Sequence, residues 1–191
     1  MSKVDRTKIY MDRVEWATKL LDETAKGKER IGVEVGLWKA DFAKFMLERD
    51  KSLHWIGVDP YFEYGKRRRK QKDWNSIHQR VIDKMKPFGD RFTLIRKPSH
   101  QGAFDIPDNV DFVFIDGNHD YDVVINDILL YEKKVRQGGI VSGHDYFAPK
   151  RGKTRVVQKA VDDCVRLLNT KLNVTNRFDP CGVFWWIKET K

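Results

Sequence analysis

Cysteine is nearly absent from this sequence of 191 residues. Its two cysteines, Cys164 and Cys181, are too few for a disulfide framework or a zinc cluster. Apolar runs are short as well, because none approaches the ~20 residues that span a bilayer. The charged N-terminus lacks the apolar core of a secretion signal. These absences argue against disulfide-rich secreted proteins and membrane-spanning proteins, and we expect an intracellular, cytoplasmic protein.

The composition is that of a packed globule. Hydrophobic residues make up 40% of the chain and aromatic residues 12%, which argues against disorder. The length suits one domain with a sizeable core. With no internal repeat, low-complexity tract or composition break, we expect a single domain over residues 1–191, of which 1–27 form a helical extension.

Positive charge is in excess and unevenly spread. The net charge is +9, and the segment Lys66–Lys72 carries six cations in seven positions. A looser basic segment covers residues 150–155. Such fields attract phosphates and anionic surfaces, so an anionic acceptor or a nucleic acid is an expected partner. The alternative is a solvated loop, because charge informs about association and not about fold.

Strand-like and helix-like patterns alternate along the chain. Strands are predicted at residues 31–35, 53–58, 92–95, 110–115 and 140–143, and helices at about 10–24, 42–49, 74–85, 121–136 and 157–168. The helix over 121–136 is expected to stop at Gly138 and Gly139. Two last strands, 172–175 and 183–188, flank Asp179–Gly182, whose turn residues predict a hairpin with an antiparallel last strand. The fold class is therefore α/β, a doubly wound, Rossmann-like, mostly parallel sheet of seven strands.

Two motifs carry the chemistry. FIDGNHDY holds Asp116 and His119, and GGIVSGHDY holds His144 and Asp145. Each motif is an apolar strand that ends in small and acidic residues, and one helix connects them. Because a crossover helix brings the carboxyl ends of parallel strands side by side, the four side chains should converge. Ligands of open α/β sheets bind at this edge, so the pattern indicates an enzyme.

The turn after the first strand indicates the kind of cofactor. A dinucleotide fingerprint would place glycines where backbone amides face a pyrophosphate, but here Glu34 stands in place of a glycine. A carboxylate repels a pyrophosphate and attracts a cationic amino acid end. Asp59, at the end of the second strand, can accept hydrogen bonds from both hydroxyls of a ribose. Acids at both points fit S-adenosylmethionine better than NAD or FAD.

From Ile31 to Lys188 the sequence resembles the class I S-adenosylmethionine-dependent methyltransferases, in particular the group with IDGxHxY followed by GGxxxGHDY. The match places Glu34, Gly36 and Leu37 in the cofactor loop and Asp59 at the ribose, with Asp116 as the acid after the fourth strand. The resemblance also implies that Tyr61 and Ser99 lie near the ribose or the adenine. The chain departs from the family at Ala40, where the loop usually has its last glycine.

Related sugar and macrolide O-methyltransferases bind a divalent metal through an acid like Asp116 and an Asp-Asp pair. Here the pair is His144-Asp145, so the implied ligands of a Mg or Mn ion are Asp116, His144 and Asp145. The relatives carry an acidic base where this chain has Asn118, which cannot take a proton. His119 is then the nearest candidate base, and His119, Asp116 and Asp145 are the candidate catalytic residues.

The sequence leaves alternatives open for these residues and for the function. His119 and His144 could be structural, and turn or cap chemistry could account for Asp59, Asp116 and Asp145. The expected function is O-methylation of a small hydroxylated or sugar-like acceptor, which rests on the resemblance. Its rivals are an RNA methyltransferase that uses the basic segment, a non-catalytic S-adenosylmethionine-binding protein and, least favoured, a nicotinamide oxidoreductase.

Overall fold

The computed structural model describes residues 6–25, 29–62, 70–148, 155–177 and 179–189. The first basic segment is therefore covered only from Lys70 on, and the second only at Arg155; residues 66–69 and 150–154 lie outside the described residues.

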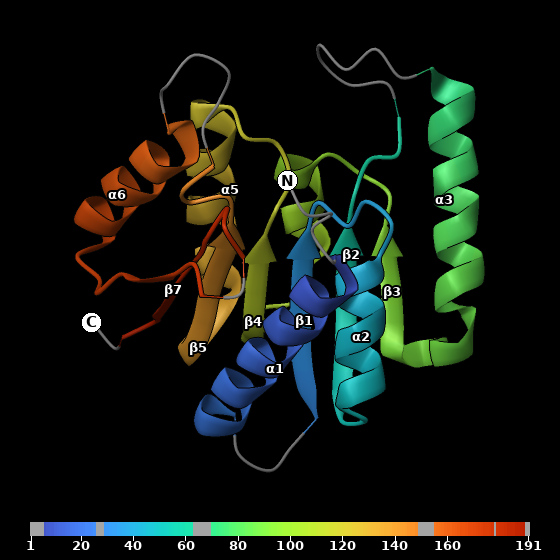
Figure 1. The fold of residues 1–191 in the computed structure, drawn as a ribbon, viewed down its shortest axis with the longest axis horizontal. Helices are drawn as coiled ribbons and strands as arrows, with labels where there is room; N and C mark the ends of the chain where they lie inside the picture. Colours follow the sequence, from blue (N-terminus) through green and yellow to red (C-terminus); the bar gives the residue numbers. More distant parts are fainter. Residues whose placement is uncertain (1–5, 26–28, 63–69, 149–154, 178, 190–191) are drawn as a thin grey trace.

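Helices and strands alternate along the chain, as Figure 1 shows. The elements are α1 (Arg6–Thr24), β1 (Arg30–Val35), α2 (Asp41–Arg49), β2 (Leu53–Val58), α3 (Gln71–Met85), η1 (Lys86–Arg91), β3 (Phe92–Ile95), α4 (Ser99–Gly102), η2 (Ala103–Asp105), β4 (Val110–Ile115), α5 (Tyr121–Lys134), β5 (Val135–His144), α6 (Val156–Leu168), β6 (Asn173–Thr175) and β7 (Val183–Ile187). Among these residues, no helix combines the length and apolar character needed to cross a bilayer.

The strands form one seven-stranded sheet in the order β3-β2-β1-β4-β5-β7-β6. The neighbours from β3 to β5 pair in parallel, whereas β7 pairs antiparallel with both β5 and β6. This arrangement confirms the predicted fold class and the antiparallel last strand. The hairpin turn is closed by the N–H of Gly182, which donates to the Asp179 carbonyl over 2.9 Å.

The start of β5 corrects one prediction. The helix before it was expected to reach residue 136 and to stop at the two glycines, but α5 ends at Lys134. The chain becomes extended at Val135, which is buried and pairs with Val110. The glycines instead occupy an irregularity in which β5 has extra residues relative to β4, and Gly138 has a φ of 70°. Glycine permits such a positive φ without steric cost, so the pair marks a bulge rather than a helix end.

Helices cover both faces of the sheet. One buried cluster joins α1, α2 and α3 to the sheet, and the other joins α5 and α6 to its opposite face. Neighbouring residues of β4 divide between the two clusters, because Phe112 and Phe114 belong to the first and Val113 and Ile115 to the second. This alternation is what a strand buried on both faces requires.

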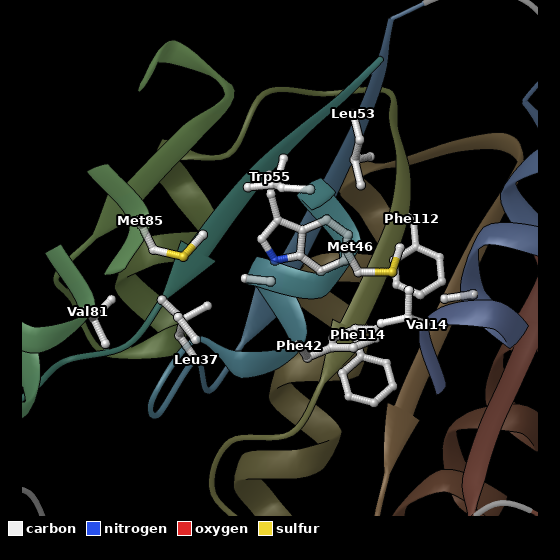
Figure 2. Packing of buried hydrophobic residues seen from close by; sticks show 14 of the residues in the cluster. Val14, Leu37, Phe42, Met46, Leu53, Trp55, Val81, Met85, Phe112 and Phe114 are labelled. Atoms are coloured by element: carbon white, nitrogen blue, oxygen red, sulfur yellow. The ribbon is translucent and has the colours of Figure 1, made fainter. Parts of the chain in front are cut away.

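The first cluster is rich in aromatic rings, and Figure 2 shows Trp55 of β2 among its members. The Trp55 ring centroid lies 5.6 Å from that of Phe42 on α2 and 5.9 Å from that of Phe112 on β4. Its indole also reaches the edge of the sheet, since Nε1 donates to Oε2 of Glu34 over 3.2 Å. The core thus positions a carboxyl group at the end of β1.

Candidate active site

The carboxyl ends of β1, β4 and β5 lie side by side. In the register of the sheet Val35 lies beside Ile115, which lies beside Gly143. The next residue of β4, Asp116, donates its N–H to the Val35 carbonyl over 2.8 Å. His144 follows Gly143 at the end of β5. The motifs are therefore brought together by the pairing of adjacent strands, as the sequence predicted.

A cavity of about 920 Å³ opens at this edge, between α1, the β1–α2 turn, the end of β2, the start of α4 and the β4–α5 turn. Acids outnumber permanent cations among its described lining residues. The acids are Glu34, Asp41, Asp59, Asp116 and Asp120, and the cations are Arg13 and Lys39. Such a lining favours a ligand that carries positive charge.

The β1–α2 turn forms one wall of the cavity. Gly36 has a φ of 92°, and a Cβ at this position would lie 2.2 Å from the Asp116 carbonyl oxygen, so only glycine fits between the two turns. Ala40, which replaces the usual last glycine, also has a positive φ of 56°. An L-residue accepts that conformation at a cost of about 1–2 kcal/mol. The substitution therefore leaves the turn in the conformation that glycine adopts more easily.

Two acids face the cavity from neighbouring strands. Glu34 is 5% exposed, and burial raises the pKa of its carboxyl group well above the usual range, against the lowering effect of the Trp55 hydrogen bond. Asp59 is held by two backbone N–H groups: Trp38 donates to Oδ2 over 2.9 Å and Tyr61 to Oδ1 over 3.1 Å. Both side chains line the cavity, where the sequence placed the cofactor.

The other two residues expected at the ribose or the adenine differ in their placement. Ser99, the first residue of α4, lines the cavity, and its carbonyl accepts a hydrogen bond from the Tyr131 hydroxyl over 2.9 Å. Tyr61 is fully buried, and its hydroxyl donates to the Trp38 carbonyl over 2.8 Å. Tyr61 is thus not among the described residues that line the cavity, although its neighbours Pro60 and Phe62 are, and its expected place near the ribose or the adenine stays a prediction. Tyr61 has a positive φ of 44°, and its side chain packs in the first core cluster.

Beside the cavity, which Asp116 and His119 line, acids and histidines form a compact cluster. His119 Nε2 lies 3.0 Å from Asp145 Oδ2 and 3.7 Å from Asp116 Oδ1. His144 Nδ1 lies 3.4 Å from Asp145 Oδ2 and 3.6 Å from Asp116 Oδ1. Asp145 has a φ of 63°, a left-handed conformation that aspartate tolerates better than most residues. The convergence of the four side chains is thus as expected, while their roles remain hypotheses.

The charged groups in the cluster shift one another's pKa values. Burial would raise the pKa of Asp116, but His144, His119 and Arg13 together lower it below its usual value. Contact with Asp116 raises the pKa of His119, against the effect of burial. For His144 burial lowers the pKa, yet Asp116, Asp145 and Asp179 raise it overall. Each histidine is therefore more easily protonated than a solvent-exposed one.

Two members of the cluster were missed by sequence reasoning, Asp179 and Arg13. Oδ2 of Asp179 lies 2.8 Å from His144 Nε2 and accepts a hydrogen bond of 2.6 Å from Arg13 Nη2. Burial would raise the pKa of Asp179, but these two partners lower it below its usual value. The sequence had assigned Asp179 only to the hairpin turn. Arg13 did offer one signal, because it falls at helical spacing from Ala17 and Leu21 and so lies on the apolar face of α1.

The donor set fits a divalent metal ion. One ligand atom from each of Asp116, His144 and Asp145 lies within 4.8 Å of the others. Carboxylate oxygens suit Mg and Mn, and an imidazole nitrogen suits later transition metals. Asp179 holds the far nitrogen of His144, as carboxylates commonly do for metal-binding histidines. Asn118 does not join this set, since its Oδ1 accepts the N–H of Asp120 over 2.8 Å.

A family model described as "Methyltransferase domain" matches residues 30–146 of the chain. Among curated proteins, Uncharacterized protein R132 of Acanthamoeba polyphaga mimivirus is 31% identical over 119 residues, which are 60% of this chain and 50% of that protein. The chain thus spans about half the length of this relative.

Similar solved structures include two O-methyltransferases and an rRNA methylase. The O-methyltransferase from Bacillus cereus, solved with SAH, has a TM-score of 0.64 at 14% identity and covers 97% of this chain and 83% of its own. TomG from Streptomyces achromogenes, an O-methyltransferase solved with SAM, has a TM-score of 0.63 at 11% identity, covering 94% and 80%. The rRNA methylase from Streptococcus thermophilus has a TM-score of 0.63 at 12% identity, covering 99% and 100%. At these identities the likeness establishes the fold.

Proposed function

The chain belongs to the methyltransferase domain family, and on that premise we propose that it transfers a methyl group from S-adenosylmethionine to an oxygen of a small hydroxylated, sugar-like acceptor. The observation that carries the proposal is the acidic cavity. Five acidic side chains line it at the carboxyl edge of the sheet, against two permanent cations in its described lining. S-adenosylmethionine brings a sulfonium, an ammonium and a ribose, and it lacks the pyrophosphate that these acids would repel.

The cofactor would lie along the wall formed by the ends of β1 and β2. Glu34 would face its cationic methionine end, with Gly36 and Leu37 in the turn beneath it. Asp59 would accept the ribose hydroxyls, and Ser99 would lie toward the adenine, because both line the same cavity. This arrangement leaves the acid and histidine cluster beside the sulfonium, where the acceptor must enter.

The reaction is an in-line displacement. A bond forms between the acceptor oxygen and the methyl carbon, the bond from that carbon to sulfur breaks, and S-adenosylhomocysteine leaves with the electron pair. Positioning of the two reactants supplies much of the rate. We assign the acceptor proton to His119, which lines the cavity and lies 3.0 Å from Asp145 through Nε2. A carboxylate only accepts hydrogen bonds, so Nε2 carries the proton and Nδ1 is left to act as the base.

A divalent ion held by Asp116, His144 and Asp145 would lower the pKa of an acceptor hydroxyl bound to it. In the protein chain these three residues would bind the ion, and Asp179 would keep His144 in place through the opposite nitrogen. Removal of metal by a chelator distinguishes this role from a reaction that uses His119 alone. Full activity after chelation, with no anomalous scattering near Asp116 in crystals grown with Mn, would end the metal hypothesis.

Calorimetry tests the cofactor assignment. We expect S-adenosylmethionine and S-adenosylhomocysteine to bind and NAD to give no heat. A radiolabelled methyl donor then reports transfer to a panel of acceptors such as a hexose, a nucleotide-linked sugar and catechol. Equal binding of NAD would overturn the cofactor assignment. Tight cofactor binding with no labelled product from any acceptor, including RNA, would favour the non-catalytic alternative.

RNA is the second candidate acceptor. It is favoured by the basic segment Lys66–Lys72 and by the likeness to the rRNA methylase. The acidic lining of the cavity opposes a polyanion, although a single base could still enter. Binding of an arbitrary oligonucleotide that weakens steeply with salt, together with label transferred to RNA, would replace the small acceptor by RNA.

A further inference from the structure

The carboxylate of Asp179 connects α1 to the β6–β7 hairpin beside the candidate active site. It lies between β6 and β7 and is 4% exposed. Its Oδ2 accepts from Nη2 of Arg13, on α1, and contacts Nε2 of His144, at the end of β5. Its Oδ1 accepts the N–H of Cys181 over 2.9 Å. The carboxylate is thus fixed from three directions.

We propose that Asp179 and Arg13 are positioning residues that hold the imidazole of His144 with Nδ1 toward Asp116 and Asp145. The proposal rests on the proposed function, because it assumes that this cluster is where the acceptor is activated. Asp179 is not among the described residues that line the cavity, whereas Arg13 is. They act through His144.

The hydrogen bond to Asp179 determines which nitrogen of His144 faces the cluster. A carboxylate with three donors around it accepts from all of them, so Nε2 of His144 carries a hydrogen. Nδ1 then points to the opposite side, 3.6 Å from Asp116 Oδ1 and 3.4 Å from Asp145 Oδ2. Without Asp179, rotation of the ring by half a turn would exchange the two edges of the imidazole and lose this alignment. A partner that orients a histidine in this way commonly changes activity by 10–100-fold.

Arg13 fixes the position of Asp179 and brings positive charge close to the acids of the cluster. Its guanidinium carbon lies 5.5 Å from the ring centroid of Tyr10, 5.8 Å from that of Phe42 and 5.3 Å from that of Phe114, so aromatic faces limit its orientation. Nη1 lies 3.8 Å from Asp116 Oδ2, which is too long for a hydrogen bond but close enough to offset charge. Within the described residues Nε has no hydrogen-bond partner, so the hydrogen bond from Nη2 to Asp179 ties the guanidinium to the cluster.

The competing interpretation is that Arg13 and Asp179 only fasten α1 to the β6–β7 hairpin. A fastening contact would change stability and leave the ring of His144 and the turnover number unaffected. The chain offers a matched control in Asp111, near the start of β4. Its carboxylate accepts from Arg136 Nε over 2.7 Å and from the N–H of Ile31 over 2.8 Å, at the opposite edge of the sheet.

The experiment compares Asp179→Asn, Arg13→Met and Arg13→Lys with Asp111→Asn. In protein labelled with ¹⁵N-histidine, the Nε2 hydrogen of His144, assigned with His144→Gln, should exchange slowly with water in the wild type and in Asp111→Asn. We expect exchange at least tenfold faster in Asp179→Asn and Arg13→Met. Arg13→Lys should fall between, because lysine keeps the charge without the fork of donors. The affinity for S-adenosylhomocysteine, measured by calorimetry, should stay within twofold in Asp179→Asn and Asp111→Asn, whereas the Arg13 variants are judged by the exchange rate because Arg13 lines the cavity.

Turnover is the second readout, taken well below each variant's melting temperature. We expect kcat to fall 10–100-fold in Asp179→Asn and Arg13→Met and to remain unchanged in Asp111→Asn, with the KM for S-adenosylmethionine unaffected in Asp179→Asn and Asp111→Asn. Wild-type exchange and wild-type kcat in folded Asp179→Asn would overturn the proposal. If no acceptor is methylated, the proposed function fails, while the exchange rates still decide whether Asp179 and Arg13 position the ring.

Discussion

The amino and carboxyl edges of the sheet carry the same types of charged residue, but these residues serve different purposes. At the amino edge, Arg136 contacts Asp111 at 2.7 Å, and Arg30 contacts Asp22 at 2.7 Å and Asp50 at 3.1 Å. At the carboxyl edge, three acids share Arg13 and two histidines, and several of the separations are 3.4–3.8 Å. These gaps exceed hydrogen-bond length. These amino-edge contacts are all of hydrogen-bond length and stabilise the fold, whereas the carboxyl edge leaves several charged groups at longer separations beside a cavity.

Removal of the proposed base should give the largest difference in kcat between substitutions at the two edges. His119→Gln should lower kcat by roughly 10²–10⁴-fold, the usual contribution of general acid–base catalysis, with little change in stability because the side chain is half exposed. Steady-state kinetics with the best acceptor measures this. At the amino edge, Asp111→Asn should leave kcat unchanged. A His119→Gln enzyme with wild-type kcat would assign the proton to another group.

Asp127 on α5 differs from the acids of both edges, because the residue is buried and only 1% exposed. Among the described residues, neither of its oxygens has a partner at hydrogen-bond geometry. Burial raises the pKa of Asp127 to about 6, and the nearby Ser99 hydroxyl offsets only part of this effect. The folded pKa lies above the unfolded one, so the folded state binds more protons between these values. Stability should therefore fall by about 3 kcal/mol as pH rises from about 4 to 6 and stay at the lower level above that.

Urea unfolding across this pH range measures the Asp127 effect. Asp127→Asn removes the charge and should remove this component of the fall, whereas Asp111→Asn should keep it. Identical pH profiles in the wild type and Asp127→Asn would mean that a water or another group compensates the buried carboxylate.

Substitution of Asp59, on the cofactor side of the carboxyl edge, should give a smaller effect. Asp59→Ala should weaken binding of S-adenosylmethionine by about 1–3 kcal/mol, the range for losing hydrogen bonds in a buried site. Calorimetry measures it, and circular dichroism must show that the turn held by the Trp38 and Tyr61 N–H groups survives. Unchanged affinity in a folded Asp59→Ala protein would move the ribose away from β2.

The smallest expected effect concerns the basic segment. Neutralising Arg67, Arg68 and Arg69 should raise the KM of an anionic acceptor severalfold at low salt and leave cofactor affinity intact. The defect should shrink as salt rises, because screening removes the advantage of the wild type. Kinetics at two ionic strengths would show it. A triple variant with wild-type KM at low salt would leave the segment as solvated surface.

Much of the fold could be read from local patterns. The bounds of β2, β3 and β4 were predicted to the residue, because each is an apolar run between turn residues. The start of β5 was not, since Val135 continues the helical spacing of α5 and only its pairing with Val110 makes it extended. Pairing between strands is a tertiary effect, and periodicity within one segment does not report it.

The residues of the site likewise divide into those that local sequence patterns predict and those that tertiary contacts place. Asp116, His119, His144 and Asp145 could be brought together from sequence because β4 and β5 are joined by one crossover helix. Asp179 and Arg13 could not, because nothing local says which edge of the sheet a hairpin turn or a helix start will approach. The expectation that Tyr61 lies near the ribose or the adenine stays a prediction, because its side chain is buried in the core while its neighbour Phe62 lines the cavity.

The pairing of Arg13 with Asp179 also bears on when the site can form during synthesis. The two residues are 166 positions apart, so at ordinary rates of translation roughly 10–30 s separate their addition to the chain. Over that interval α1 and the first strands can already associate, but the guanidinium among Tyr10, Phe42 and Phe114 lacks its carboxylate partner. A nascent chain halted before Asp179 should therefore carry a loosely held α1, and the later emergence of the β6–β7 hairpin would complete the histidine cluster.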